Sequence, residues 1–173
     1  MSFRQFTDGE VLFAADVMKY FVQQVHARKL ADETVTNSNV FNSDDHLFVP
    51  VLASTRYWVE FFLIYDAPQA ADIKMQWLVP AGSTFRWTHG GLHTDATTTI
   101  DRVSRFYRDQ TLVGTAAGGS AGGGTNTIVP GEGWLDVAGT AGNLQLQWSQ
   151  VNANATGTIV RTNSLLIAQR LTE

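Results

Sequence analysis

The spacing of hydrophobic side chains changes along this chain, from helical spacing near the start to alternation afterwards. Between Ala14 and Leu30, apolar residues recur at intervals of one, three, one and three, which places them on one side of a helix. The sequence therefore predicts one amphipathic N-terminal α-helix. Its apolar stripe consists of Val17, Met18, Phe21, Val22 and Val25. Because a lone helix of this length is marginal in water, we expect the stripe to dock on the chain's own sheet, on copies of itself or on a larger assembly.

Beyond Leu30 the apolar residues follow a period of two, which is typical of β-strands. The strongest predictions are strands over His46–Val51 and Thr55–Asp66. In the second segment, the residues on both sides of the alternation are largely apolar. A strand of this kind is expected in the middle of a sandwich or at an interface between subunits, and Glu60 within it needs a polar partner.

Further strands are predicted over residues 71–80, 84–90, 98–111, 127–139, 143–151, 156–162 and 164–171. Turn sequences separate them, and no helices alternate with them, so the expected fold class is all-β. Specifically, we expect an antiparallel β-sandwich, jelly-roll-like, with one N-terminal α-helix. Residues 1–32 would form the N-terminal arm and attachment helix, and residues 33–173 the sandwich.

Two further features of the predicted sandwich can be read from residue type. The glycine-rich segment 114–127 has neither phosphate-binding motif, and we expect it to be a flexible surface loop. Aromatic residues at strand centres usually belong to the core. On this basis we expect four tryptophans to be buried: Trp58, Trp77, Trp134 and Trp148.

Composition narrows the classes of partner. The 173-residue chain has a formal net charge of −4 and lacks a cluster of basic residues, which argues against nucleic acid and anionic membranes as partners. It contains no cysteine, which excludes disulfides and thiolate-bound metals. No apolar run approaches the ~18 residues of a membrane span, and no secretory pattern opens the chain, so we expect synthesis in a cytoplasm.

The most site-like cluster is Trp87-Thr88-His89-Gly90-Gly91-Leu92-His93-Thr94-Asp95. Two histidines four residues apart bind zinc well on a helix, but the Gly90-Gly91 pair favours a turn, so no metal is expected. Trp87, His89 and His93 remain candidates for a surface contact with a glycan or another protein. The acidic residues are better explained by turns and solvation than by a catalytic pair. No nucleophile motif is present. We therefore expect no enzyme activity and no cofactor.

Two stretches resemble a known family. Phe6–Gln24, "FTDGEVLFAADVMKYFVQQ", is similar to the opening of many minor tail proteins of tailed phages that infect actinobacteria. Tyr57–Trp87 and Gly142–Leu171 resemble the β-rich body of the same proteins, so the likeness covers well over half of the chain. This chain departs from the family pattern at Phe13, where the family usually has a threonine N-cap, and at Lys19, where it often has asparagine.

The resemblance implies a virion structural protein that binds other virion proteins, with the sandwich assembled as a homotrimer and the N-terminal segment as its attachment. The apolar stripe at Val17–Val25 would be the docking surface. A tail or tail-tip subunit is the first interpretation. A capsid decoration or head-fibre protein on the phage head is the alternative, and a module that binds a host-surface carbohydrate or receptor is a further one.

Overall fold

The computed structural model describes residues 7–11, 13–14, 16–17, 23–94, 103–110, 116–120 and 122–171, of which 103–110 and 116–117 are described by their backbone alone. These residues contain twelve strands. They are β1 (Gln23–Arg28), β2 (Glu33–Val35), β3 (Asn42–Val51), β4 (Arg56–Asp66), β5 (Ile73–Leu78), β6 (Thr84–Leu92), β7 (Val103–Gln110), β8 (Ala116–Gly118), β9 (Thr127–Asp136), β10 (Gly142–Ser149), β11 (Thr158–Val160) and β12 (Leu165–Leu171).

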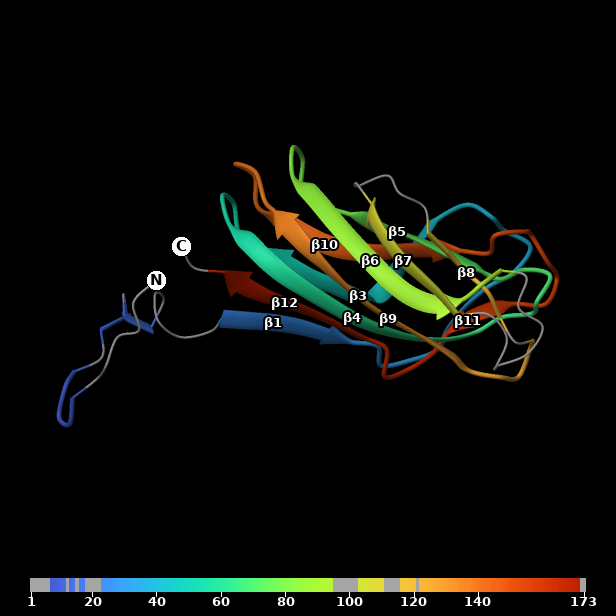
Figure 1. The fold of residues 1–173 in the computed structure, drawn as a ribbon, viewed down its shortest axis with the longest axis horizontal. Coiled ribbons are helices and arrows are strands. Elements are labelled where there is room, and N and C mark those ends of the chain that lie inside the picture. Colours follow the sequence, from blue (N-terminus) through green and yellow to red (C-terminus); the bar gives the residue numbers. More distant parts are fainter. Residues whose placement is uncertain are drawn as a thin grey trace.

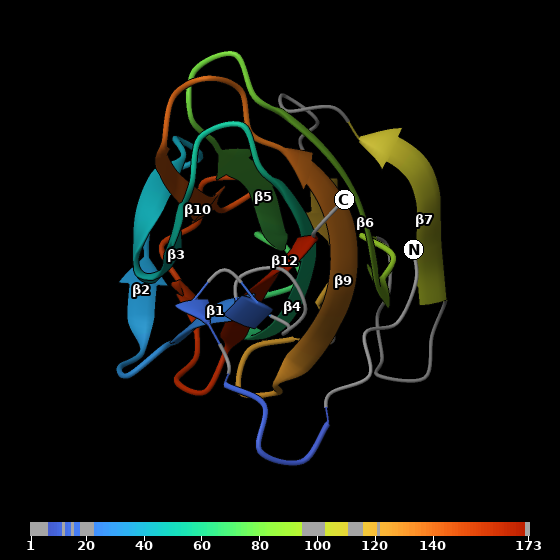
Figure 2. The same cartoon turned by 90° about the vertical axis from the view of Figure 1, so that its left-hand side faces the viewer.

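The strands form two antiparallel sheets. The larger sheet has the order β1-β12-β4-β9-β6-β7, and β11 also pairs with β4 and carries β2 on its other side. The smaller sheet has the order β3-β10-β5-β8. Seen end-on, β3, β10 and β5 lie on one side of the molecule, with β4, β9 and β6 on the other (Figure 2). From β3 to β5 the chain changes sheet at each connection, and it does so again from β8 to β10. The predicted antiparallel β-sandwich is confirmed.

The core lies between the two sheets, and β4 crosses its centre. Its inward set, Tyr57, Val59, Phe61, Leu63 and Tyr65, is at most 4% exposed. From the smaller sheet, the inward side of β10 contributes Leu144, Leu146 and Trp148, each fully buried. The neighbouring Gln145 and Gln147 are only partly buried, as their alternation predicts.

Aromatic rings fill the middle of the core, and two glycines of β9 make room for them. Phe61 contacts Trp77 and Trp87 with ring centroids 5.1 and 6.0 Å apart. Gly131 pairs with Phe61 across the sheet, and a Cβ atom there would lie 2.0 Å from that ring. A Cβ atom at Gly133 would meet a second core ring at 2.5 Å. The alternation of Pro130-Gly131-Glu132-Gly133-Trp134 therefore places small residues inward and large or charged ones outward.

The predicted helix over Ala14–Leu30 is wrong for its C-terminal part, because residues 23–28 form β1 and pair with β12 through six registered positions. The sequence Gln23-Gln24-Val25-His26-Ala27-Arg28 also alternates with period two. Pairing with β12 supplies a backbone partner for every residue of the strand, and this tertiary contact overrides the helical spacing. Farther back, a single helical turn is present, in which the Val17 amide donates to the Phe13 carbonyl at 3.2 Å.

The glycine-rich segment is also more ordered than predicted, because residues 116–118 form β8 against β5. Gly118, Gly119 and Ser120 are buried. The Ser120 amide donates to the Asp72 carboxylate at 2.9 Å, and the Gly124 amide donates to Asp66 at 2.9 Å. Backbone amides that bond to acidic side chains hold this stretch against the sandwich, an interaction that glycine content does not reveal.

The N-terminal arm, residues 7–17, lies beyond the end of the sandwich where β1 begins and β12 ends (Figure 1). In its described part, Val11, Phe13 and Val17 are 69%, 66% and 42% exposed. Three large apolar side chains on a projecting arm are therefore open to solvent.

Replacing Gly131 by alanine tests the packing of β9. The new methyl group must displace the Phe61 ring, so Gly131→Ala should lower the free energy of unfolding by about 1–3 kcal/mol, measured by urea denaturation. Gly139→Ala is the matched control, because nothing lies within 4 Å of the Cβ position there. Equal stability of the two variants would contradict this packing.

Candidate functional site

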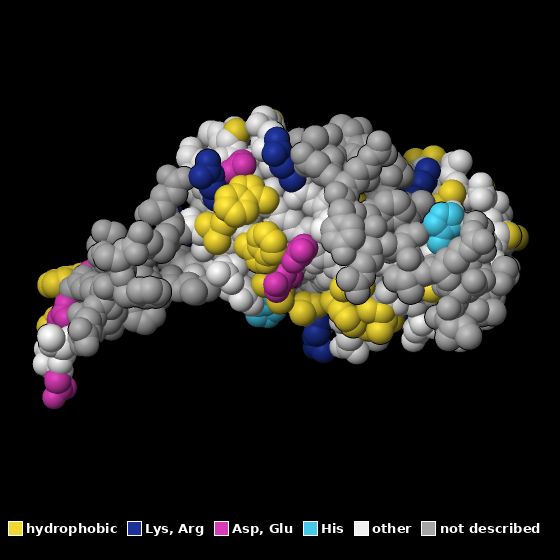
Figure 3. Space-filling model, viewed as in Figure 1, with side chains coloured by type: hydrophobic (Ala, Val, Ile, Leu, Met, Phe, Trp, Pro, Cys, Tyr) yellow, Lys and Arg dark blue, Asp and Glu magenta, His cyan; other side chains and the backbone are white. Residues whose placement is uncertain are grey.

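The outward side of the larger sheet is unusually apolar. It carries Trp58, Phe62 and Ile64 from β4, with Pro130, Ile128 and Trp134 from β9 and Leu165 and Ile167 from β12. Phe62 and Trp134 are each 40% exposed and Ile128 is 49% exposed. We call these eight residues the apolar face. Figure 3 shows hydrophobic side chains on both sides of carboxylates on the surface over β4 and β9.

Cross-strand register arranges this surface in rows. Trp58 lies opposite Trp134, Glu60 opposite Glu132, Phe62 opposite Pro130 and Ile64 opposite Ile128. On the other side of β4, Ile167 pairs with Glu60 and Leu165 with Phe62. Three of the four rows across β4 and β9 are apolar, and the Glu60–Glu132 row lies between the tryptophan row and the other two. The apolar side chains therefore gather on this face and are not isolated exposed residues.

The outward side of the smaller sheet is different in character. There Gln76 bonds to Gln147 at 2.8 Å, and Gln147 bonds to Ser43 at 3.1 Å. Exposed Phe48 and Leu78 lie on opposite sides of Gln145 in this sheet. The smaller sheet therefore presents hydrogen-bonded amide side chains beside these two apolar residues, whereas three of the four rows across β4 and β9 on the larger sheet are apolar.

A groove of about 600 Å³ opens on the apolar face. Glu60 and Glu132 line it together with Phe62, Pro130 and Ile167. The indole N–H of Trp58 donates to Glu60 at 3.3 Å. Two carboxylates directly opposite each other on neighbouring strands repel, so this pair is costly in the isolated chain.

The structure corrects the candidate surface contact for Trp87 and His89, whereas for His93 it stays a prediction. Trp87 is 2% exposed and His89 3% exposed, and the two rings stack at 5.7 Å. Burial lowers the pKa of the His89 imidazole, so the neutral ring is favoured. His93 is partly buried. Because Trp87 shares its side of β6 with Phe85, its ring belongs to the core and is not available to a glycan.

Of the four tryptophans that we expect to be buried, two face the core and two lie on the opposite side of their strands. Trp77 and Trp148 are buried as expected, at 3% and 0% exposed. Trp134 and Trp58 instead lie on the outward side of the larger sheet. Alternation shows which tryptophans share a side, but it does not show which side faces the core when both are apolar.

The predicted docking stripe is only partly within the described residues. Met18, Phe21 and Val22 lie outside them. Val17 is exposed on the N-terminal arm, whereas Val25 lies in β1 and packs against the core. Val17 and Val25 therefore do not share one helical face, and the exposed apolar residues of the arm are Val11, Phe13 and Val17.

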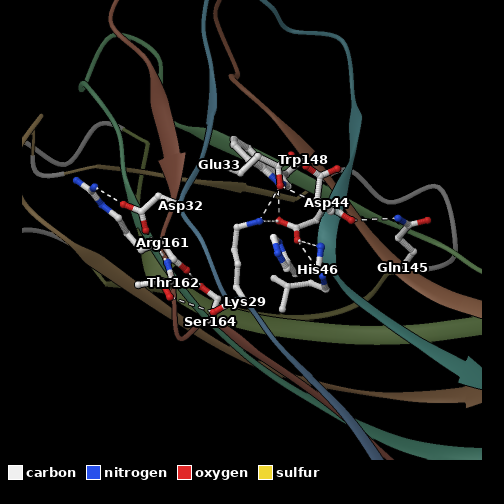
Figure 4. A network of polar contacts seen from close by, with 12 residues as sticks. Lys29, Asp32, Glu33, Asp44, His46, Gln145, Trp148, Arg161, Thr162 and Ser164 are labelled. Carbon is white, nitrogen blue, oxygen red and sulfur yellow. Dashed lines mark hydrogen bonds and ion pairs between the residues drawn. The ribbon is translucent and has the colours of Figure 1, made fainter.

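A buried ion pair is the most concentrated polar cluster, and its bonds show a structural role (Figure 4). The Lys29 ammonium lies 2.7 Å from both Asp44 and Glu33, and Lys29 and Asp44 are fully buried. Asp44 also accepts the Trp148 indole N–H at 3.0 Å and the backbone amides of residues 46 and 47. Its carboxylate oxygens are filled by these four donors, which ties the end of β1 to β3 and β10 and leaves little capacity for catalysis.

A second polar cluster surrounds Arg161, in the connection between β11 and β12. Arg161 bonds Asp66 at 2.6 Å and Asp32 at 2.8 Å. The hydrogen bond from the Thr162 amide holds the pKa of Asp32 below its usual range, and the hydrogen bond from Arg161 contributes in the same direction. Both contacts stabilise the connections between strands.

Asp72 is a buried carboxyl whose charge is disfavoured. Burial raises its pKa to about 6, although the hydrogen bond from the Ser120 amide opposes this shift. Burial raises the pKa of the Tyr65 hydroxyl, and the nearby Asp72 carboxylate raises it further. Tyr65 donates to the Gly119 carbonyl. The group lies beneath the glycine-rich segment, away from the apolar face.

In the part of the chain that the structure describes, no group of three or more histidine or acidic side chains could hold a metal ion. The same residues include no helix long and apolar enough to cross a membrane.

Removing the buried ammonium tests the Lys29 cluster. Lys29→Met would leave the buried Asp44 carboxylate without its cation, so we expect a loss of about 3–5 kcal/mol in the free energy of unfolding, measured by urea denaturation. Arg56→Met is the control, because the Arg56–Asp136 pair is 51% and 43% exposed and should contribute less than about 1 kcal/mol. A loss at Lys29 no larger than that at Arg56 would show that the cluster is not needed for stability.

The raised pKa of Asp72 predicts a pH dependence of stability. The folded state holds this proton more tightly than the unfolded state, so the contribution is full below about pH 4 and is lost as pH rises through about 6. Asp72→Asn should therefore be more stable than the wild type by about 1–3 kcal/mol near pH 7.5 and equal to it near pH 4. Asp72 has φ of 52°, which asparagine also tolerates. A gain of equal size at both pH values would reflect the backbone alone and would contradict the charge effect.

Comparison with known proteins does not assign this chain to a family. No protein-family profile matches the chain, and no curated protein matches it. Similar solved structures include infectious bursal disease virus Gt strain, with 11% identity over 88% of this chain and 38% of that chain and a TM-score of 0.23. They also include the VP2 subviral particle of the same virus (12% identity, 86% and 39% coverage, TM-score 0.21) and its Gx strain (12%, 86% and 35%, TM-score 0.20). The chain spans less than two-fifths of those chains, and at these TM-scores the likeness carries no argument about its fold or function.

Proposed function

We propose that this chain is a structural protein of a phage virion that acts by binding other protein subunits. The observation that carries the proposal is the apolar face, where Phe62, Ile128 and Trp134 are at least 40% exposed on one side of the larger sheet. An exposed patch of large apolar side chains is typical of an interaction site. The N-terminal arm adds a second apolar surface that the sandwich does not cover.

The strand order supports a jelly roll as the scaffold. β1-β12-β4-β9 in one sheet faces β3-β10-β5-β8 in the other, which is the order of a two-Greek-key jelly roll, with the β6–β7 hairpin inserted after β5. Jelly rolls are common in viral capsid proteins, although they also occur in lectins and other classes. Fold class alone therefore does not choose among these functions.

Within the virion, we place the chain in the tail or tail tip as a minor tail protein. The support is the sequence resemblance of Phe6–Gln24, Tyr57–Trp87 and Gly142–Leu171 to that family. A decoration or fibre protein on the head would use the same two apolar surfaces and is the alternative. The carbohydrate-binding interpretation keeps only His93 of its three candidate residues, because Trp87 and His89 are buried.

The proposed role is assembly and not catalysis, with other virion proteins as partners and a homotrimer as the expected state. The two most concentrated polar clusters, around Lys29 and Arg161, consist of side chains that bond one another. An assembly protein needs buried surface at fixed contacts and has no need of a reactive group.

The test is incorporation into virions. The wild-type chain should be found at constant copy number in purified particles of the phage that encodes it. Val11→Asp with Phe13→Asp should lower that copy number at least about tenfold, because each aspartate would carry its charge into an apolar contact. The melting temperature of the isolated chain should not change, since both residues lie outside the sandwich.

The matched control is Val40→Asp, because Val40 is as exposed as Val11, at 69%, but lies in the loop before β3. It should enter particles like the wild type. Absence of the wild-type chain from particles would contradict the proposed function, and normal incorporation of the double variant would contradict the role of the arm.

A further inference from the structure

The groove on the apolar face contains an unusual charge arrangement. Glu60 and Glu132 lie opposite each other on β4 and β9, and both are exposed. Apolar rows flank them on each side, with Trp58 and Trp134 in one row and Phe62 and Pro130 in the other. Among the described residues, no lysine, arginine or histidine forms an ion pair with either carboxylate.

This arrangement specifies the chemistry of an occupant. A single cation placed between the two carboxylates would relieve their repulsion and bond both. Apolar groups next to that cation would cover the flanking rows, and the tryptophan rings could also contact it through their faces. The groove is therefore complementary to a lysine or arginine with aromatic or aliphatic neighbours.

The chain itself contains such a segment in Phe3-Arg4-Gln5-Phe6, which lies outside the described residues. In an extended segment, Arg4 and Phe6 would point to the same side, about 7 Å apart. Glu60 and Phe62 are likewise two residues apart on β4, with their side chains on one side of the strand. The spacing of cation and ring in this segment thus matches the spacing of acid and ring in the groove.

We propose that the groove binds the Phe3–Phe6 segment of a second copy of this chain. Gln23, at the start of β1, is nineteen positions after Arg4, and an extended chain of that length reaches at most about 65 Å. The described arm residues project past the end of their own sandwich (Figure 1), so a second copy beside that end would lie within this reach. The inference rests on the proposed structural role and specifies one partner of it.

Self-association of the full chain measures this contact. In sedimentation velocity, the wild type should associate at micromolar concentration and dissociate as salt is raised, because the contact includes exposed charges. Arg4→Glu should weaken association at least tenfold, and so should Glu60→Lys with Glu132→Lys. Mixing the two variants should restore association, because each then supplies the charge that the other lacks.

Asp45→Lys with Glu10→Lys is the control, because it reverses two acids outside the groove, one on the smaller sheet and one on the arm. It should associate like the wild type. A second readout avoids any effect of the groove variant on folding: a labelled peptide of residues 1–12 should bind the full-length Arg4→Glu chain and compete with unlabelled peptide, but a peptide with Arg4→Glu should not.

Three results would overturn the inference. They are a wild type that is monomeric throughout the concentration range, charge variants that associate like the wild type, and failure of the mixed variants to recover. If the groove variant were lost from virions while self-association stayed normal, the occupant would be a different protein. In each case the proposed function would still stand, because it depends on the presence of the chain in particles.

Discussion

The structure depends on a constraint in β4, whose residues are apolar on both sides. Burying Tyr57, Val59, Phe61, Leu63 and Tyr65 in the core leaves the alternate set on the outside, because successive side chains of a strand point to opposite sides of the sheet. Strands β9 and β12 pair with β4 and carry apolar residues at the same outward rows. A single sandwich can cover only one side of this sheet. The other side must meet either water or a second protein.

Other features of the fold keep the inward side of β4 well packed. Gly131 and Gly133 leave space for core rings, and the Lys29–Asp44 pair closes the end of the sandwich beside β1. The buried Lys29 ammonium bonds two carboxylates, and the Asp44 carboxylate accepts hydrogen bonds from four donors. This cluster therefore stabilises the fold and does not offer a reactive group. Structural polar residues and the candidate binding surface are thus separated on the molecule. The surface is defined by exposed apolar residues and by two carboxylates, Glu60 and Glu132, that lie opposite each other.

Most strands could be predicted from period-two patterns, because alternation is a local property of the sequence. The position of β1 could not, since Val22 and Val25 satisfy a helical period and the pairing partner β12 is nearly 140 residues away. The short strand β8 is not apparent from the sequence, because it lies in a glycine-rich segment that is held in place by hydrogen bonds to Asp66 and Asp72. The apolar pattern of Thr55–Asp66 predicts a strand in the middle of a sandwich or at a subunit interface, but it does not choose between the two. Sequence alternation could not decide that Trp87 faces the core while Trp134 faces outward, because that choice depends on how the sheets stack.

If the chain acts as proposed, protein covers the apolar face in the assembled particle. Hydroxyl-radical footprinting of the free chain and of purified virions tests it most directly, by comparing the oxidation rates of Trp134 and Phe62. Trp148 provides an internal reference, since it is fully buried in the sandwich and should resist oxidation in both samples. Trp134 and Phe62 should oxidise readily in the free chain and be protected in the particle. Equal oxidation of these residues in both samples would contradict it.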